Sequence, residues 1–276
     1  MYKSSDPYIC IVINIMMKFI LQTINHKIVH DFVFELDRGI DYWKWKGEKV
    51  EVLYCELEDL DHLHSPQDYI PQGTIEFVFK FIDLYIEPLG SKYIHPIPAI
   101  LDNCSDTWLT KNLSEWVNKT SLPEKYNQFY IKSASKFKSS YSGVYSLEEI
   151  RKGIPGIPED DTIQIKLFYE DIKSEYRCFV YRGELLDIKR YEFLDPGDVY
   201  IDPDEVRNIM KSIRIKLPAY SFDIMVDQEN TCRLLEIHEI FSTGTYGFSD
   251  YQNYPWMCIR GFQELKRRVK NHEENL

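Results

Sequence analysis

The feature that most constrains the fold of this chain is a predicted antiparallel hairpin between residues 220 and 238. Two runs that alternate between apolar and polar residues flank a polar tip, which is the typical sequence form of a β-hairpin. If the turn is the two-residue loop 229–230, counting back along both strands puts Asp223 directly across from Glu236. Their β-carbons would then lie about 5 Å apart.

Three side chains of this hairpin predict a divalent metal site. Two carboxylates that face each other on adjacent strands repel unless a cation lies between them, and His238, on the same face as Glu236, offers a third ligand. A shift of one residue in the loop would turn the two carboxylates to opposite faces. The alternative is that Asp223 and Glu236 are two solvated acids on an exposed face of the sheet.

The length and charge of the chain exclude several classes of protein. Its 276 residues suffice for one large domain or two modest ones with a buried core. A formal net charge of −11 argues against a protein that binds bulk nucleic acid or a membrane surface, because both need clustered Lys and Arg. Small nucleotides stay possible, since a metal ion and a few lysines can hold a triphosphate.

Two further features predict a cytoplasmic protein. The six cysteines form no CxxC pair and show no regular spacing, which favours free thiols in a reducing compartment. The apolar run Ile9–Met17 is far shorter than the roughly 20 residues needed to cross a bilayer, and no small-residue cleavage site follows it. We therefore interpret residues 1–16 as an appended segment outside the functional fold, before a first strand near Lys18.

Local patterns predict most of the other elements. The expected strands include residues 28–36 and 50–57, with an aromatic turn at 43–47 between them. Apolar residues at helical spacing predict a helix over 106–118, with Asp106 as its N-cap. Further helices are expected after Pro71, after a capping box at Ser146, after Asp202-Pro203, and over residues 255–270.

A lysine-containing segment follows the next predicted strand. Lys132 ends a strand that starts near Phe129, and Lys136 and Lys138 lie in the small-residue loop behind it. Small residues let backbone N–H groups approach an anion, and nearby ammonium groups neutralise it, so the segment is suited to phosphates. The alternative is an ordinary Ser- and Lys-rich surface loop, and the segment lacks the P-loop pattern.

A second hairpin is predicted from residue 175 to residue 191. With Arg182-Gly183 as its turn, Glu175 lies opposite Arg190, and a cross-strand ion pair explains both residues. The same register sets Arg177 opposite Ile188 and assigns this arginine no charged partner within the hairpin. Arg177 is therefore a candidate for binding an anion.

The order of these motifs resembles the nucleotide-binding half of the ATP-grasp superfamily. More narrowly, it resembles the clade that is named for an arginine and two lysines and is widespread in phages and bacteria. The likeness covers residues 71–248. Five stretches carry it in the family's order: Pro71–Val78, Ile131–Phe137, Ser174–Val180, Phe222–Ile224, and Leu235–His238 with Gly244–Gly247.

The resemblance implies an α+β protein with the ATP-grasp fold, in which two α+β subdomains hold ATP between antiparallel sheets. It also implies a division of the chain into three parts. These are a possible extension over residues 1–16, a smaller N-terminal α/β domain over 17–105, and the nucleotide-binding and catalytic domain over 106–276.

The resemblance further implies a role for each matching residue. The strand around residues 164–168 would read the adenine of ATP, and Arg177 would stabilise the γ-phosphate or an acyl phosphate. The residues expected to contact the nucleotide are Lys132, Lys136, Gln164, Lys166, Leu167 and Glu175. Those expected to take part in catalysis are Arg177, Lys136 and Arg190.

Asp223 and Glu236 would bind a Mg²⁺ ion that bridges the phosphates. The family usually has Glu-x-Asn at this position, whereas this chain has Glu236-Ile-His238. Because imidazole is a softer ligand than an amide oxygen and titrates near neutrality, we expect a shift toward Mn²⁺ and a fall in activity below about pH 6.5. The change is also compatible with a protein that binds nucleotide without turnover.

The activity implied is that of an ATP-dependent ligase. ATP would activate a carboxylate as an acyl phosphate, and an amine, or less often a thiol, would attack it with release of ADP and phosphate. The expected partners are small-molecule or peptide carboxylates and amines. Two alternatives stay open: a nucleotide-binding protein of this fold that has lost catalysis, and a non-enzymatic interaction protein.

Overall fold

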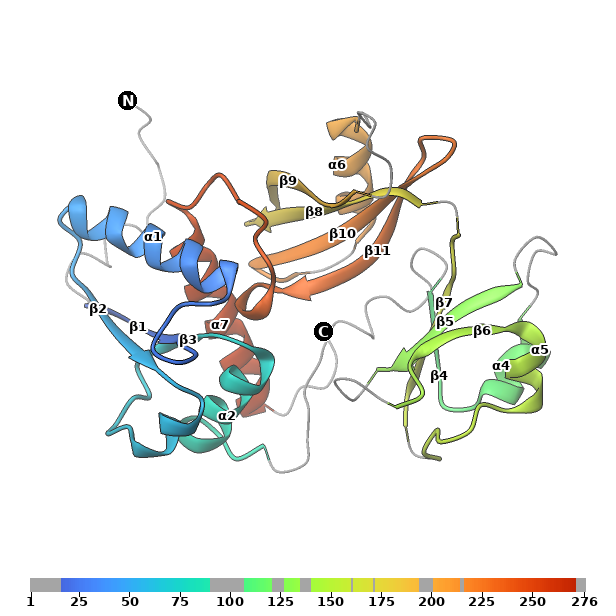
Figure 1. The fold of residues 1–276 in the computed structure, drawn as a ribbon, viewed down its shortest axis with the longest axis horizontal. Helices are drawn as coiled ribbons and strands as arrows, with labels where there is room; N and C mark the ends of the chain where they lie inside the picture. The colour runs from blue at the N-terminus through green and yellow to red at the C-terminus, as the bar shows by residue number, and fades with distance from the viewer. Residues whose placement is uncertain are drawn as a thin grey trace. The chain divides into compact units, whose positions relative to one another are not determined.

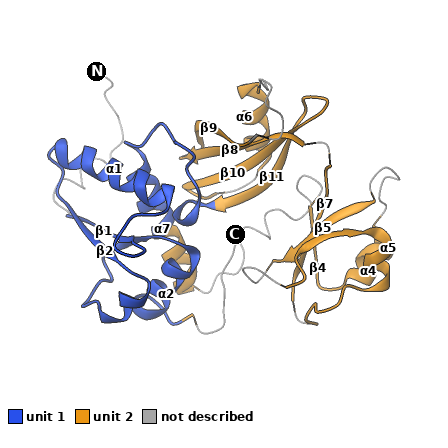
Figure 2. Ribbon diagram, viewed as in Figure 1, with its two compact units in different colours: residues 1–88, 239–263 blue, residues 89–238, 264–276 orange. Residues whose placement is uncertain are grey.

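A computed structural model describes residues 16–89, 107–120, 127–134, 140–159, 161–170, 172–193, 201–213 and 216–271. The chain forms two compact units (Figure 2). Unit 1 consists of residues 1–88 and 239–263, and unit 2 consists of residues 89–238 and 264–276. The expected domains over residues 17–105 and 106–276 stay a prediction.

Unit 1 is built on a parallel sheet with the strand order β2-β1-β3 (Figure 1). Parallel strands need crossover connections. Here α1 lies in the connection from β1 to β2, the short 3-10 helix η2 lies in that from β2 to β3, and α2 follows β3. The elements are β1 (Met17–Gln22), α1 (Asp31–Trp45), β2 (Val50–Cys55), η2 (Glu58–His62), β3 (Ile70–Gln72) and α2 (Ile75–Tyr85).

The strand predicted over residues 28–36 and the turn predicted over 43–47 are wrong, because α1 occupies most of both. The buried residues of this helix recur at helical spacing: Phe32, Val33, Leu36, Ile40 and Trp43. Phe34 between them is 56% exposed. Too few residues of this segment alternate clearly for the sequence pattern to distinguish a strand from a helix. The helix forms because it buries one continuous apolar stripe.

Residues from the end of the chain complete unit 1. They form η3 (Ile240–Ser242) and the start of α7 (Tyr254–Asn271). The indole Nε1 of Trp43 donates to the carbonyl of Gln252 at 2.9 Å. The rings of Trp43 and Trp256 lie 4.9 Å apart between centroids. The core of unit 1 therefore joins segments that are about 200 residues apart in the sequence.

Unit 2 contains two four-stranded antiparallel sheets. The first has the order β4-β7-β5-β6 and packs against α4 and α5 around an apolar core. Its elements are β4 (Thr107–Thr110), α4 (Leu113–Lys119), β5 (Gln128–Ser133), β6 (Gly143–Ser146), α5 (Leu147–Lys152) and β7 (Ile163–Leu167). These sheets agree with the expected α+β architecture.

The helix predicted over residues 106–118 is only partly correct. Residues 107–110 form the edge strand β4, in which the buried Thr107 pairs with Lys166. The helix starts later, where the side chain of Asn112 accepts from the N–H of Glu115. The predicted cap Asp106 lies outside the described residues. The apolar residues at helical spacing are divided between the short strand β4 and the short helix α4. Over residues 107–110, pairing with β7 outweighs the helical pattern.

The second sheet has the order β11-β10-β8-β9 and carries α6 on one face (Figure 1). Its strands are β8 (Ile172–Tyr181), β9 (Glu184–Phe193), β10 (Ala219–Asp227) and β11 (Cys232–Glu239), and α6 spans Pro203–Ser212. As predicted, Asp202 caps α6 and Pro203 begins it. The capping box at Ser146 is likewise present in front of α5.

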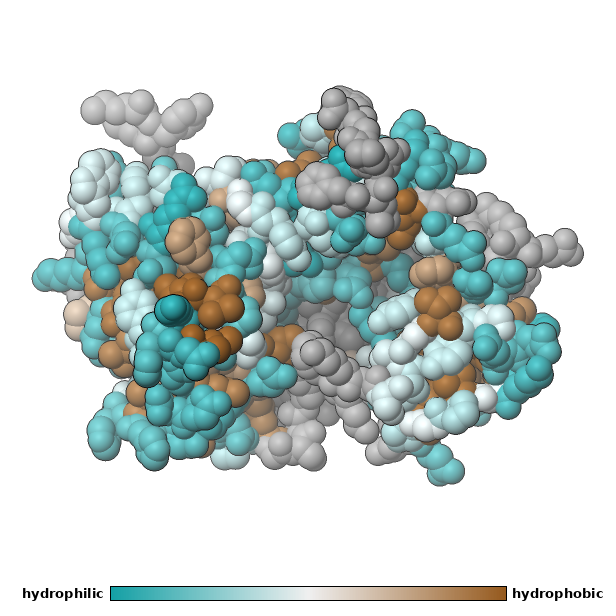
Figure 3. Space-filling view, in the orientation of Figure 1, coloured by the Kyte–Doolittle hydropathy of each residue, from teal (hydrophilic) through white to brown (hydrophobic). Residues whose placement is uncertain are grey.

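The surface drawn in Figure 3 is mostly hydrophilic, and apolar residues lie on it in small separate groups. Among the described helices, none combines the length and the apolar character that crossing a bilayer requires.

Candidate functional site

The second sheet of unit 2 presents a polar group of side chains on the face opposite α6. The core under α6 takes the even-numbered residues of β8 and β10, including Cys178, Phe222 and Ile224. Because successive side chains of a strand point to opposite faces, Arg177 and Asp223 project from the other face. They are directly paired across the two strands.

The turn of the hairpin β10–β11 differs from the prediction. Asn230 N–H donates to the carbonyl of Asp227 at 3.0 Å, and Asp227 N–H donates to that of Thr231 at 3.2 Å. The loop is therefore Gln228–Asn230, one residue longer than expected. Asn230 adopts a left-handed conformation with φ 60°, which asparagine tolerates better than most residues. Taken alone, this loop would turn Glu236 away from Asp223.

An irregularity in β11 restores the shared face. Leu234 and Ile237 both belong to the core under α6, although residues three apart in a regular strand point to opposite sides. The alternation therefore shifts by one residue between them. Glu236 and His238 thereby reach the face of Asp223, and ligand atoms of the three residues lie within 4.8 Å of one another.

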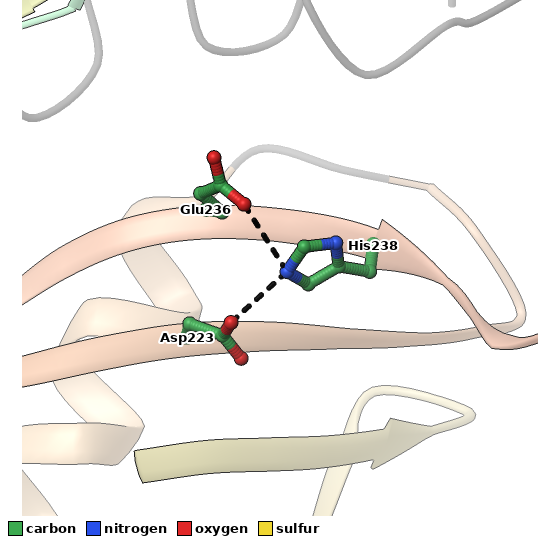
Figure 4. A group of neighbouring side chains, drawn as sticks. All are labelled: Asp223, Glu236 and His238. Carbon is green, nitrogen blue, oxygen red and sulfur yellow. Dashed lines mark hydrogen bonds and ion pairs between the residues drawn. The ribbon is translucent and has the colours of Figure 1, made fainter. Parts of the chain in front are cut away.

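Figure 4 shows the three side chains converging around the imidazole of His238. Its Nε2 lies 3.0 Å from Asp223 Oδ2 and 3.6 Å from Glu236 Oε2. Asp223 is buried, whereas the side chains of His238 and Glu236 are 28% and 39% exposed. The group is thus open to solvent on the side of Glu236. We call Asp223, Glu236 and His238 the acidic trio.

Arg177 binds Asp223 through two hydrogen bonds. Its Nε donates to Oδ1 and its Nη2 to Oδ2, both at 2.8 Å. Burial opposes the charged form of Asp223, but hydrogen bonds from Arg177 and His238, together with their charges, outweigh it and hold the pKa of Asp223 well below its usual range. Arg177, which the sequence left as a candidate for binding an anion, is thus paired in this structure.

Lys132, at the end of β5, forms an ion pair with the second carboxylate. Its Nζ lies 2.6 Å from Glu236 Oε1, and this ion pair connects the first sheet of unit 2 to the second. Burial acts to raise the pKa of Glu236, but the charges of Lys132 and His238 outweigh it and lower this pKa. Each carboxylate of the acidic trio is therefore compensated by one cation.

The register of β8 and β9 corrects the prediction for Arg190. Tyr181 pairs with Glu184 as expected, but an irregularity between Phe179 and Val180 shifts the register, so that Arg177 pairs with Lys189 and Arg190 with Tyr176. A second irregularity sets Glu175 opposite Glu192. Tyr176 belongs to the core under α6, so Arg190 lies on that side of the sheet. The predicted Glu175–Arg190 ion pair is therefore wrong, and the structure does not bring Arg190 to the acidic trio.

Tyr191 takes the place beside Glu175 that the sequence predicts for Arg190. Its hydroxyl lies 2.6 Å from Glu175 Oε2 and 3.2 Å from Asp223 Oδ2. Burial raises the pKa of Glu175, and the charge of Asp223 adds to this effect, while the hydrogen bond from Tyr191 opposes it. A register count without bulges gave no signal for Tyr191.

A pocket of about 240 Å³ adjoins the acidic trio. The end of β7 and the residues after it form one wall, and side chains from the second sheet form the other. Its lining residues are Tyr130, Lys166, Leu167, Phe168, Tyr169, Ile172, Glu175, Tyr191, Asp223, Leu235 and Glu236. Lys166, Leu167 and Glu175 were expected at the nucleotide, whereas Gln164 lies buried in β7 opposite Lys132. Lys136 lies outside the described residues.

Lys166 links the two sheets of unit 2 at the irregularity in β11. Its buried Nζ donates to the carbonyl of Leu234 at 2.9 Å and also to that of Leu235. A strand that shifts its alternation leaves carbonyls without ladder partners, and here a lysine from another sheet satisfies them. The resemblance implies that Lys166 contacts the nucleotide, and this role stays a prediction.

The acidic trio fits a divalent cation. Two carboxylate oxygens and one imidazole nitrogen are common ligands of such ions, and they converge from two adjacent strands within 4.8 Å of one another. A cation bound there would contact the carboxylates of Asp223 and Glu236, which also contact Arg177 and Lys132. The roles of these residues as ligands and phosphate contacts stay predictions.

Comparisons with known proteins agree with this geometry. A family model described as an ATP-grasp domain, family 2 of the clade named for an arginine and two lysines, matches residues 111–255, more than half of the chain. No curated protein sequence matches the chain.

Several solved structures are similar in fold. A D-cycloserine synthetase, DcsG, has a TM-score of 0.54 at 10% identity, over 91% of this chain and 99% of that one. A RimK domain ATP-grasp protein from Sphaerobacter thermophilus has 0.53 at 10%, over 89% and 99%. An N5-carboxyaminoimidazole synthetase from Staphylococcus aureus has 0.52 at 12%, over 89% and 77%. At such identities the similarity concerns the fold alone.

Proposed function

Because this chain belongs to the arginine-and-two-lysine clade of ATP-grasp domains, we propose that it is an ATP-dependent ligase that joins a carboxylate to an amine through an acyl phosphate. The observation that carries the proposal is the pairing of two cations with two carboxylates beside one pocket: Arg177 with Asp223, and Lys132 with Glu236. Phosphoryl transfer depends on positioning and on charge neutralisation, and these four groups supply both.

Each of these side chains has a defined task in the proposed reaction. Lys132 and Arg177 turn from the carboxylates to the phosphates of ATP, where their charge offsets the negative charge of the transferring group. Asp223, Glu236 and His238 hold a divalent ion, which supplies further charge neutralisation when bound. The pocket beside them takes the adenine along residues 167–169 at the end of β7. Lys136 keeps its expected contact with the phosphates.

The bond changes of the proposed reaction balance without a protein nucleophile. A carboxylate oxygen of the substrate attacks the γ-phosphorus, and the bond from this phosphorus to the β-phosphate oxygen breaks to release ADP. A neutral amine then attacks the acyl carbon, phosphate leaves, and the nitrogen loses one proton. Arg177 stabilises the negative charge on the acyl phosphate. The four cysteines within the described residues are buried, and the proposal assigns them no role.

The substrates are proposed only by class, as a small-molecule or peptide carboxylate and an amine. The structures similar in fold include proteins named as synthetases, and this is consistent with joining reactions. We further propose that the protein acts in the cytoplasm, where ATP is available.

The proposal is tested by nucleotide binding and then by turnover. Mg·ATP or Mn·ATP at a hundred times its dissociation constant should stabilise the protein by about 2.7 kcal/mol. Glu236→Ala should abolish this stabilisation, whereas Glu148→Ala, which removes an exposed carboxylate paired with Lys152 in the same unit, should leave it intact. ADP release should then increase with one carboxylate and amine pair from a panel.

The outcomes separate the alternatives. A wild-type protein that no nucleotide and metal pair stabilises would be a non-enzymatic interaction protein. Stabilisation without ADP release for any substrate pair would indicate a nucleotide-binding protein that has lost catalysis.

A further inference from the structure

His238 is the member of the acidic trio that offers nitrogen rather than oxygen. Its Nε2 faces Asp223 and Glu236 at 3.0 and 3.6 Å (Figure 4). An imidazole ligates a metal through a neutral ring nitrogen, so ligation here places the proton on Nδ1. A metal ion at Nε2 would therefore replace the hydrogen bond between Nε2 and Asp223 Oδ2 and would displace the guanidinium of Arg177, whose Nη2 lies 3.3 Å from Nε2.

The charges around the trio do not favour a hard cation. Asp223 and Glu236 contribute two negative charges, and Arg177 and Lys132 contribute two positive ones, so the four groups sum to zero. Both oxygens of Asp223 already accept from Arg177. Mg²⁺ is bound mainly through the negative charge of oxygen ligands, and it keeps several waters. While Arg177 and Lys132 pair with the carboxylates, that source of affinity is largely cancelled. When both cations turn to the phosphates of ATP, the carboxylates serve either ion, and the nitrogen of His238 is the ligand that distinguishes the two.

A nitrogen donor favours a different kind of ion. The affinity of such a ligand rises along the first transition series from Mn²⁺ toward Cu²⁺, and imidazole ligates these ions more readily than it ligates Mg²⁺. The remaining lone pairs of the carboxylates keep oxygen ligands available, as Mn²⁺ and Co²⁺ accept. We propose that His238 makes this site select Mn²⁺ or Co²⁺ over Mg²⁺. This inference rests on the proposed function, since it concerns the metal that accompanies the nucleotide.

The test compares the wild-type chain with His238→Asn, which replaces the imidazole nitrogen with an amide oxygen. The non-hydrolysable analogue AMP-PNP is present, the free Mn²⁺ is followed by its electron paramagnetic resonance signal, and Mg²⁺ affinity is measured by competition. The ratio of the Mn²⁺ and Mg²⁺ affinities should fall at least about tenfold in the variant, because loss of a ligand should cost no less metal affinity than the roughly tenfold lost when only a partner of a ligand is mutated. His64→Asn, an exposed histidine in unit 1, should leave the ratio unchanged.

A spectroscopic measurement identifies the ligand directly and needs no variant. Pulsed electron paramagnetic resonance of bound Mn²⁺ should show coupling to a nitrogen nucleus, and ¹⁵N labelling of histidine should change that coupling. Loss of the coupling in His238→Asn assigns it to this residue. If His238→Asn does not fold, the labelled wild-type protein still decides whether a histidine ligates the ion.

The inference fails if bound Mn²⁺ shows no histidine nitrogen, if the affinity ratio is the same in wild type and His238→Asn, or if no Mn²⁺ binds. Failure of the proposed function has a different signature, because then either AMP-PNP would not stabilise the protein or no substrate pair would increase ADP release. In that case the same resonance measurement on the nucleotide-free protein still tests whether His238 ligates Mn²⁺.

Discussion

At the scale of single residues, the two cationic side chains of the site, Arg177 and Lys132, contact the carboxylates that would bind a metal ion. Lys132 lies 2.6 Å from Glu236 and is about one-third exposed. Its positive charge repels a metal ion at the acidic trio when no phosphate is present to attract it. Removing this charge should therefore strengthen metal binding and weaken nucleotide binding.

We expect Lys132→Met to bind Mn²⁺ several times more tightly than the wild type in the absence of nucleotide, an effect of about 1 kcal/mol for a partly exposed pair. The same variant should bind AMP-PNP more weakly, because a charge-assisted contact to phosphate is lost. Calorimetric titration measures both affinities. Lys152→Met removes an exposed lysine with the same distance of 2.6 Å to its carboxylate partner, and both affinities should stay unchanged.

At the scale of elements, β11 decides which residues reach the site. The hairpin, its residue types and the presence of Asp223, Glu236 and His238 on one face could be predicted from alternation. The reasons for that arrangement could not, because a longer loop and a shift of alternation between Leu234 and Ile237 offset each other. Such an irregularity depends on a partner from another sheet, here Lys166, and a local sequence pattern does not reveal that partner.

The shift of alternation in β11 gives a prediction for Lys166, which is not a candidate metal ligand. Lys166→Met should lower stability by about 1–3 kcal/mol, since it leaves the carbonyls of Leu234 and Leu235 without this donor. Mn²⁺ affinity should fall with it, because Glu236 and His238 lose their orientation. Urea denaturation and metal titration measure the two effects.

Lys173→Met provides the matched control for Lys166→Met. Lys173 donates to Gln228 and Asn230 at the exposed tip of the same hairpin, so its loss should affect the metal little. If Lys166→Met bound Mn²⁺ as tightly as Lys173→Met, the link between the sheets would not hold the ligands in place.

The start of α5 carries a prediction about acid stability. The hydroxyl and the N–H of Ser146 both donate to Glu149, and these hydrogen bonds lower the pKa of Glu149. A carboxylate with a lowered pKa in the folded state contributes stability above its unfolded pKa of about 4.3, and this contribution is lost as the pH falls through the folded value. Ser146→Ala removes the hydroxyl and its part of the effect.

We expect Ser146→Ala to cost about 1 kcal/mol at neutral pH through loss of the N-cap, and to lose less stability than the wild type on acidification below the ordinary glutamate pKa. Chemical denaturation at a series of pH values measures this slope. Ser212→Ala, at the C-terminal end of α6, removes a hydroxyl that donates to the carbonyl of Ile209, and it should keep the wild-type slope. Parallel slopes for Ser146→Ala and wild type would contradict the assignment.

At the scale of the whole molecule, the α+β architecture could be predicted, whereas the composition of unit 1 could not. Hydrophobic periodicity indicates which face of an element is buried but not which distant segment covers it. Residues 239–263 follow the last strand of the site in the sequence, yet they pack with residues 1–88. Asp31 accepts from the N–H groups of Thr245 and Tyr246, more than 200 residues later.

Gly39 tests whether these distant segments form one cooperative unit. It lies in α1, and a β-carbon at this position would come within 2.4 Å of the Tyr251 carbonyl and 2.9 Å of the Pro255 ring. Gly39→Ala should therefore push residues 251–255 away from α1. The strain of such overpacking is about 1–3 kcal/mol, and the better helix propensity of alanine, about 1 kcal/mol, offsets only part of it.

Hydrogen exchange followed by mass spectrometry gives the decisive readout for Gly39→Ala. Amides of α1 and of residues 251–263 should both exchange faster, because the two segments share one core, while those of β8 and β10 in unit 2 should keep their rates. Asp41→Ala raises helix propensity at an exposed position of α1 and should speed neither. Faster exchange in α1 alone would mean that the C-terminal segment folds without it, and unit 1 would then be two units.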